Sequence, residues 1–169
     1  MASRLGSCIA VAVICLIFYI VFTGSLRLYD IVTGVIVSLT SGAIVGELIV
    51  RNSSKFFSPR RILRLLAYTV KYFLVYEVKA HLEVMRIILS PKPRYTPAIV
   101  RVPYQSSSEY AIMLAGNSIT NTPGTLVVDV DEDKRLFYVH WLNALTLEPR
   151  EAYRFILEYF DKNAVKIFD

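Results

Sequence analysis

Three aspartates near the C-terminal end have a spacing that could bind a metal ion. Asp129, Asp131 and Asp133 alternate along the chain as the first ligands of a calcium-binding loop do. An EF-hand loop beginning at Asp129 would require glycine at position 134 and glutamate at position 140. The chain has Lys134 and His140 at these positions, so the sequence excludes an EF-hand.

The remaining residues with reactive or metal-binding side chains also lack suitable partners. His140 and His81 each stand without a second ligand at useful spacing. Cys8 and Cys15 lie seven residues apart in an apolar run, where they predict packing rather than a disulfide framework or a zinc site. The chain has no Ser-His-Asp order and no phosphate-binding loop. We therefore expect no catalytic residue, cofactor, metal or small-molecule substrate.

The first fifty residues carry most of the apolar excess of the chain. Apolar residues make up 54% of the sequence and charged residues 20%, with a net charge of +5. Residues 5–22, LGSCIAVAVICLIFYIVF, contain no charge and as a helix nearly cross a hydrocarbon core of roughly 30 Å. Arg4 and the small residues 23–25 also permit a signal peptide, but a signal core is usually about 7–15 residues. A transmembrane helix is favoured.

A second apolar run, residues 31–50, carries a stripe of small residues. Gly34, Ser38, Gly42 and Gly46 recur at every fourth position, which places them along one side of a helix. Small residues allow a second helix to approach closely in a membrane. The partner is either the first span or a helix of another protein, and we expect part of the stripe to face another subunit.

Basic residues predict the orientation of these spans. The exit of the second span is followed by Arg51, Lys55, Arg60, Arg61 and Arg64, whereas the turn between the spans offers Arg27 opposed by Asp30. Positive residues favour the cytoplasmic side. We expect a multi-pass protein of the cell membrane whose N-terminus and C-terminal domain are cytoplasmic. These basic residues lack a base-stacking motif, so no nucleic-acid partner is expected.

A third helix is predicted over residues 60–89, ended by Pro91 and Pro93. Its basic residues fall within an arc of about 80° and form a predicted membrane-surface stripe: Arg61, Arg64, Lys71, Lys79 and Arg86. A true span would bury Lys71 and Glu77, each at a cost of roughly 3 kcal/mol or more. The sequence favours a helix that lies along the membrane or beside other subunits without reversing the topology. Asp30, Glu47 and Glu77 are interpreted as structural carboxylates.

The C-terminal part alternates between strand and helix patterns. Ser106 and Glu109 match a capping box, which predicts a helix ending at residues 116–117. Residues 122–125, TPGT, predict a type II turn. Strands are predicted over 97–103, 126–130 and 137–142, and a final helix over 146–162, with Ala152, Phe155, Ile156, Tyr159 and Phe160 on its apolar side.

The predicted fold class is an α+β membrane protein. Two N-terminal transmembrane helices occupy residues 1–52, a basic membrane-associated helix occupies 53–92, and a small cytoplasmic β-α-β-β-α sandwich occupies 93–169.

Two stretches, GNSITNTPGTLVVDVDEDKRLFYVHWLNA and VYEVKAHLEVMRIILSPKPRYTPAIVRVP, resemble the E-type subunit of the Mrp-type multisubunit sodium/proton antiporters. The resemblance runs from Leu74 to Phe168 and is densest over 117–143, where Asn121 replaces the usual leucine. The two spans agree with the family in arrangement but carry no diagnostic motif. The residues of the family signature are Asn117, Ser118, Thr120, Thr122, Pro123, Gly124, Thr125, His140 and Trp141.

This resemblance implies a non-catalytic accessory subunit that contributes to the assembly and stability of a cation/proton antiporter complex. The implied partners are other membrane subunits and the lipid bilayer. Archaeal respiratory complexes such as membrane-bound hydrogenases carry a related accessory module, so the resemblance leaves both kinds of assembly open. The alternative is a membrane-anchored binding module that recruits a soluble cytoplasmic partner.

Overall fold

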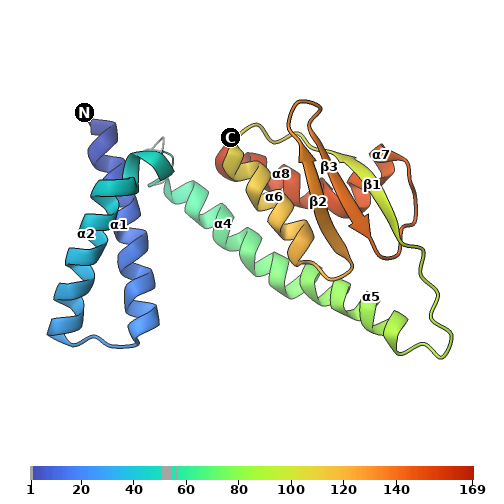
Figure 1. Cartoon of the computed structure of the whole chain (residues 1–169), viewed down its shortest axis with the longest axis horizontal. Helices are drawn as coiled ribbons and strands as arrows, with labels where there is room; N and C mark the ends of the chain where they lie inside the picture. The colour runs from blue at the N-terminus through green and yellow to red at the C-terminus, as the bar shows by residue number, and fades with distance from the viewer. Residues whose placement is uncertain (1, 51–54, 56) are drawn as a thin grey trace. The chain divides into compact units, whose positions relative to one another are not determined.

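The computed structural model describes residues 2–50, 55 and 57–169, and the chain divides into two compact units, Met1–Ile62 and Leu63–Asp169. Arg51, which enters the charge argument, lies outside the described residues. The first unit contains the helices α1 (Ala2–Thr23) and α2 (Leu28–Ile49) side by side (Figure 1). Each is long and apolar enough to cross a membrane.

The small-residue stripe is the buried side of α2. Its buried residues are Gly34, Ser38, Gly42 and Gly46, and they face α1. A Cβ atom at Gly46 would lie 2.6 Å from the Cα atom of Cys8, and one at Gly34 would lie 2.6 Å from the Tyr19 ring. Because α1 fills the space along the stripe, the expectation that part of it faces another subunit is corrected: the stripe joins two helices of one chain.

The two carboxylates at the ends of this hairpin have local partners. Glu47 forms an ion pair with Arg4 across the hairpin, with 3.0 Å between Oε1 and Nε. Asp30 accepts a hydrogen bond from the Ser25 hydroxyl at 2.5 Å. Both contacts agree with the structural interpretation of these carboxylates.

The second unit contains a three-stranded antiparallel sheet in the order β1-β3-β2 (Figure 1). The strands are β1 (Ala98–Pro103), β2 (Thr125–Asp131) and β3 (Leu136–Trp141), with a bulge in β2 between Val127 and Asp129. The predicted type II turn precedes β2: the Thr125 amide donates to the Thr122 carbonyl at 3.3 Å, and Gly124 has φ +92°. The predicted strands and hairpin are therefore present.

Helix α6 (Glu109–Asn121) differs from its predicted ends. Its N-cap is Ser108, whose hydroxyl accepts from the Ala111 amide, so the capping box at Ser106 is wrong. Ser106 is instead buried and bonds to Asp161. The helix also continues past Gly116 to Asn121. Gly116 packs on the sheet, where an added Cβ atom would lie 3.5 Å from the Phe137 ring.

The last helical run comprises α7 (Pro149–Ala152), the π-helical segment η2 (Tyr153–Leu157) and α8 (Glu158–Phe168). It starts and ends later than predicted. Ala152, Ile156 and Phe160 are buried as expected, but Phe155 is 62% exposed. The wider turn of η2 places Phe155 on the outer side, which the 3.6-residue period did not predict.

A long helix completes the second unit. It runs through α4 (Pro59–Lys71), the π-helical segment η1 (Tyr72–Glu77) and α5 (Val78–Ile88). Tyr68 and Tyr72 on this helix belong to the same core as β3, α6 and α8. The compact unit therefore begins at Leu63, whereas the sequence divided the chain at residues 92/93.

Candidate functional site

The signature serine anchors the long helix to α6. The Ser118 hydroxyl donates to the Leu114 carbonyl at 2.7 Å, and it also contacts the Tyr68 hydroxyl. Because the serine proton is directed to Leu114, the Tyr68 phenol must be the donor in the second bond. Burial raises the pKa of Tyr68, so the phenol keeps its proton at neutral pH and remains a donor.

A second tyrosine, one turn further along the long helix, forms hydrogen bonds at the C-terminal end of α6. The Tyr72 hydroxyl accepts from the Asn121 amide at 3.0 Å and donates to Glu77 Oε2 at 2.9 Å. It also lies 3.3 Å from Thr122 Oγ1, which in turn donates to the Ser118 carbonyl at 2.6 Å. Desolvation raises the pKa of Tyr72. The departure from leucine at Asn121 therefore adds a hydrogen bond to the long helix.

The other signature hydroxyls hold the turn between α6 and β2. Thr125 Oγ1 donates to the Ile119 carbonyl at 2.8 Å, and Thr120 Oγ1 accepts from the Val127 amide at 3.2 Å. A Cβ atom at Gly124 would lie 3.4 Å from Val84 of α5. The signature is thus a connector that joins α6, the hairpin and the long helix. Asn117 is exposed and lies outside these contacts.

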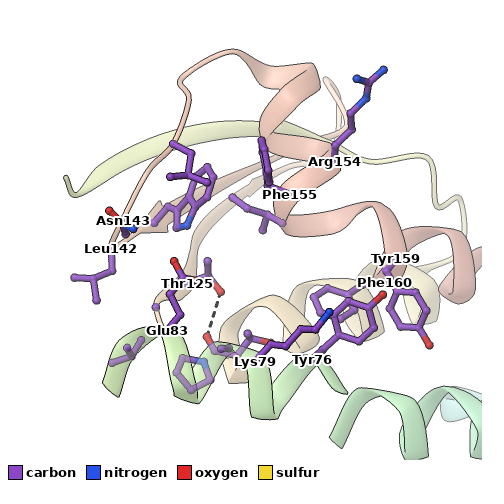
Figure 2. Close-up of a pocket in the computed structure, with 18 of the residues that line it drawn as sticks. Tyr76, Lys79, Glu83, Thr125, Leu142, Asn143, Arg154, Phe155, Tyr159 and Phe160 are labelled. Atoms are coloured by element: carbon purple, nitrogen blue, oxygen red, sulfur yellow. Dashed lines mark hydrogen bonds between the residues drawn. The ribbon is translucent and has the colours of Figure 1, made fainter. Parts of the chain in front are cut away.

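The same turn forms one wall of a cavity of about 390 Å³ (Figure 2). The second wall is α5 with Tyr76 of η1, and the third is made by η2 and α8. Trp141, at the end of β3, is only 8% exposed and lines the cavity. Figure 2 shows Phe155 extending from η2 toward the cavity, with Lys79 and Tyr76 on the opposite helix. His140 alternates with Trp141 and lies on the other face of the sheet.

Charged residues of both signs border the cavity. Lys79 and Glu83 come from α5, and Glu158 comes from α8. Lys162 binds Glu158 at 2.6 Å and lowers the pKa of that carboxyl group. Arg154 extends away from the cavity (Figure 2).

The five residues of the predicted basic stripe lie in different settings. Arg64 Nη1 donates to the Lys166 carbonyl at 2.9 Å, and the Lys71 ammonium lies 4.8 Å from the centre of the Tyr159 ring. Lys79 borders the cavity, Arg86 is exposed, and Arg61 belongs to the first unit. Arg64, Lys71 and Lys79 therefore contact the C-terminal helix or border the cavity while remaining exposed, and a membrane-surface role of the five residues stays a prediction.

The long helix also exposes a series of large apolar side chains. Nine large side chains on it are 48–73% exposed: Leu63, Leu66, Val70, Phe73, Leu74, Val78, Leu82, Met85 and Leu89. We call this set the apolar stripe. Apart from the neighbours Phe73 and Leu74, its residues follow one another at steps of three and four, so the π-helical segment keeps the residues of α4 and α5 in line.

Sequence reasoning predicted the signature residues but not the cavity they border. Phe155 was predicted to lie on a buried helix face, and no sequence motif marked Glu83 or Leu145 as part of a site. Their proximity depends on the pairing of α5 with the C-terminal helices. Within the described ranges, no group of three or more His, Cys, Asp or Glu residues could hold a metal ion.

Comparisons with known proteins agree with the resemblance. A family model described as Na+/H+ ion antiporter subunit matches residues 12–167. The E-type Na(+)/H(+) antiporter subunit of Alkalihalophilus pseudofirmus is 32% identical over 103 residues, which are 59% of this chain and 65% of that protein. The E-type subunit of Bacillus subtilis is 31% identical over 126 residues, 72% of this chain and 78% of that protein.

A solved structure is similar along nearly the whole chain. It is that of the membrane-bound sulfane sulfur reductase, an archaeal respiratory membrane complex. One of its chains has 27% identity and a TM-score of 0.84, covering 96% of this chain and 99% of that one. Taken with the family match over residues 12–167, these similarities establish that the chain belongs to the family of E-type Na+/H+ antiporter subunits.

Proposed function

We propose that this chain is a non-catalytic accessory subunit of a multisubunit cation (Na+)/proton antiporter assembly, and that it contributes to assembly and stability. The assembly is either a free-standing antiporter or the antiporter part of a respiratory complex such as a membrane-bound hydrogenase. One observation supports a structural role above the others. The signature hydroxyls of Ser118, Thr122 and Thr125 all contact neighbouring elements of the fold.

The proposed membrane arrangement has α1 and α2 as the two spans, with the N-terminus and the C-terminal unit in the cytoplasm. The long helix lies along the membrane with its apolar stripe toward lipid or toward apolar surfaces of neighbouring subunits. Contacts along the other side support this arrangement, since the helix binds the C-terminal unit from Arg64 to Val84. A third span would carry that polar unit into the bilayer at a large cost.

Purification in mild detergent tests the functional proposal. The affinity-tagged chain, expressed with its natural neighbours, is expected to co-purify with multispan antiporter-like subunits. Recovery with one soluble companion and no multispan subunit would instead favour the membrane-anchored binding module. The topology is tested separately: protease added outside intact cells should leave the C-terminal unit uncut.

A nitroxide scan tests the position of the long helix. Labels at Leu66 and Leu82, on the apolar stripe, should be more accessible to oxygen than to a water-soluble relaxation agent. A label at Lys162, on the exposed side of α8, serves as the aqueous control. Equal accessibility to the aqueous agent at all three positions would rule out burial of the stripe.

A further inference from the structure

The cavity beside the signature turn contains a buried donor that the fold does not use. Trp141 is more than nine-tenths buried, yet its indole N–H makes no hydrogen bond to any residue that the structure describes. The indole nitrogen is not completely buried. Because Trp141 lines the cavity, this nitrogen is accessible from it. Because indole nitrogen is a donor only, an occupant must present an acceptor oxygen.

Exposed apolar side chains surround the same cavity. Phe155 and Leu145 line it and are 62% and 64% exposed, and Leu147, two residues further along the chain, is 69% exposed. A buried aromatic residue with a ring of exposed apolar side chains is typical of protein–protein hot spots. A small molecule confined to about 390 Å³ would leave this rim in water. An acyl chain would leave the indole N–H without an acceptor.

The unpaired charges at the border favour an acidic partner. Lys79 and Glu83 form no ion pair with the residues described, and the charge of Glu158 is offset by Lys162. Arg154 also lines the cavity, and its guanidinium group, which extends outward, adds a positive charge around the opening (Figure 2). The net charge that remains is therefore positive, which attracts a carboxylate.

We propose that this cavity receives an extended segment of a neighbouring membrane subunit. An apolar side chain enters between Trp141 and Phe155, a backbone carbonyl accepts the indole N–H, and an adjacent carboxylate binds Lys79. This inference rests on the proposed function, because it assumes that the chain is assembled with other subunits. The signature turn then has a second role: it forms the wall that positions Trp141.

Site-specific photocrosslinking in cells that produce the complete assembly tests the proposal. Benzoylphenylalanine replaces Phe155 in one variant and Met113 in a control variant. Met113 is 60% exposed on α6 and does not line the cavity. The Phe155 probe is expected to capture a subunit of the co-purifying complex at a segment with an apolar residue next to an acidic one. The Met113 probe should capture none of that segment.

A charge variant gives a second measurement. Lys79→Glu should reduce crosslinking from position 155 by about tenfold, the effect of losing about 1.4 kcal/mol. Arg101→Glu makes the same change of charge on the exposed side of β1, outside the cavity, and should leave crosslinking unchanged. Trp141 is the only tryptophan of the chain, so its emission in the purified variants verifies that the unit is folded.

Several outcomes would overturn the proposal. These are equal capture at both positions, a lipid adduct, capture of a second copy of this chain, and no adduct in an intact complex. If the chain purifies without multispan subunits, the proposed function itself fails. If the complex is intact and the Phe155 probe captures none of its subunits, this inference alone fails.

Discussion

Removing the acceptor of the Tyr68–Ser118 hydrogen bond should destabilise the protein more than removing its donor. In Ser118→Ala the Tyr68 phenol loses its acceptor and remains buried, with the side chain 4% exposed. An unsatisfied buried donor costs about 1–3 kcal/mol. In Tyr68→Phe the serine still donates to the Leu114 carbonyl, and the loss is one ordinary bond of about 1 kcal/mol. We therefore expect Ser118→Ala to destabilise the unit more than Tyr68→Phe does.

The double variant makes the reasoning decisive. With both groups removed, no phenol is left unpaired, and the Leu114 carbonyl keeps its place in the α6 helical ladder. The double variant should therefore be no less stable than Ser118→Ala alone. This corresponds to a coupling free energy of about 1–2 kcal/mol in a double-mutant cycle.

Denaturant unfolding of the full chain in mild detergent measures these values. Trp141 is the single tryptophan and lies in the core of the second unit, so its emission follows that unit. The free energies of unfolding of the four proteins complete the cycle. If Ser118→Ala costs no more than Tyr68→Phe, or if the two losses simply add, the assigned direction of the hydrogen bond is wrong.

Three further predictions concern packing, a buried carboxylate and pH. Gly42→Leu should weaken the α1–α2 pair by roughly 1–3 kcal/mol, because a Cβ atom at this position would meet backbone atoms of α1. The measurement is the resistance of the hairpin to denaturing detergent, with Ala43→Leu on the exposed side as the control. Asp161→Ala should lower the free energy of unfolding by about 3 kcal/mol, since the buried carboxylate accepts hydrogen bonds from two backbone N–H groups and a serine hydroxyl. The control variant Lys162→Ala, which removes an exposed ion pair, should unfold at the same denaturant concentration as the wild type. Burial raises the pKa of Tyr68 above 10.0, so the folded state holds the phenol proton more tightly than the unfolded state does. The contribution of Tyr68 to the free energy of unfolding is therefore complete below pH 10 and is lost as the pH rises through the folded-state pKa. At alkaline pH the free energy of unfolding should fall more steeply with pH in the wild type than in Tyr68→Phe, and equal slopes would contradict this.

Local patterns predicted most of the elements. The uncharged run over residues 5–22, the small-residue stripe and the Thr122–Thr125 turn each depend on neighbours in sequence. Their outcome is set by helix period or backbone preference, which the chain carries locally. The N-terminal end of α6 was predicted wrongly because a residue distant in sequence binds the predicted capping residue. Ser106 bonds to Asp161, 55 residues away, and this contact moved the cap to Ser108.

The π-helical segment η1 explains why the apolar stripe of the long helix was not predicted. Arg64 and Lys71 precede η1, so their contacts with α8 follow from tertiary packing and not from the wider turn. The wider turn acts on the later residues: it keeps Val78 and Leu82 in line with Leu66 and Val70, which a wheel at 100° per residue would separate. A uniform helical period cannot predict this change.

The sequence by itself determined the two apolar helices, the strand order of the hairpin and the signature turn, because these follow from periodicity and turn chemistry within short windows. Only the tertiary structure decided which partners the stripe of α2 and the tyrosines of the long helix would select. It also decided that Trp141, Phe155 and Lys79 would border one cavity. These residues come from three separate elements, and their distances depend on the packing of a shared core rather than on any local preference.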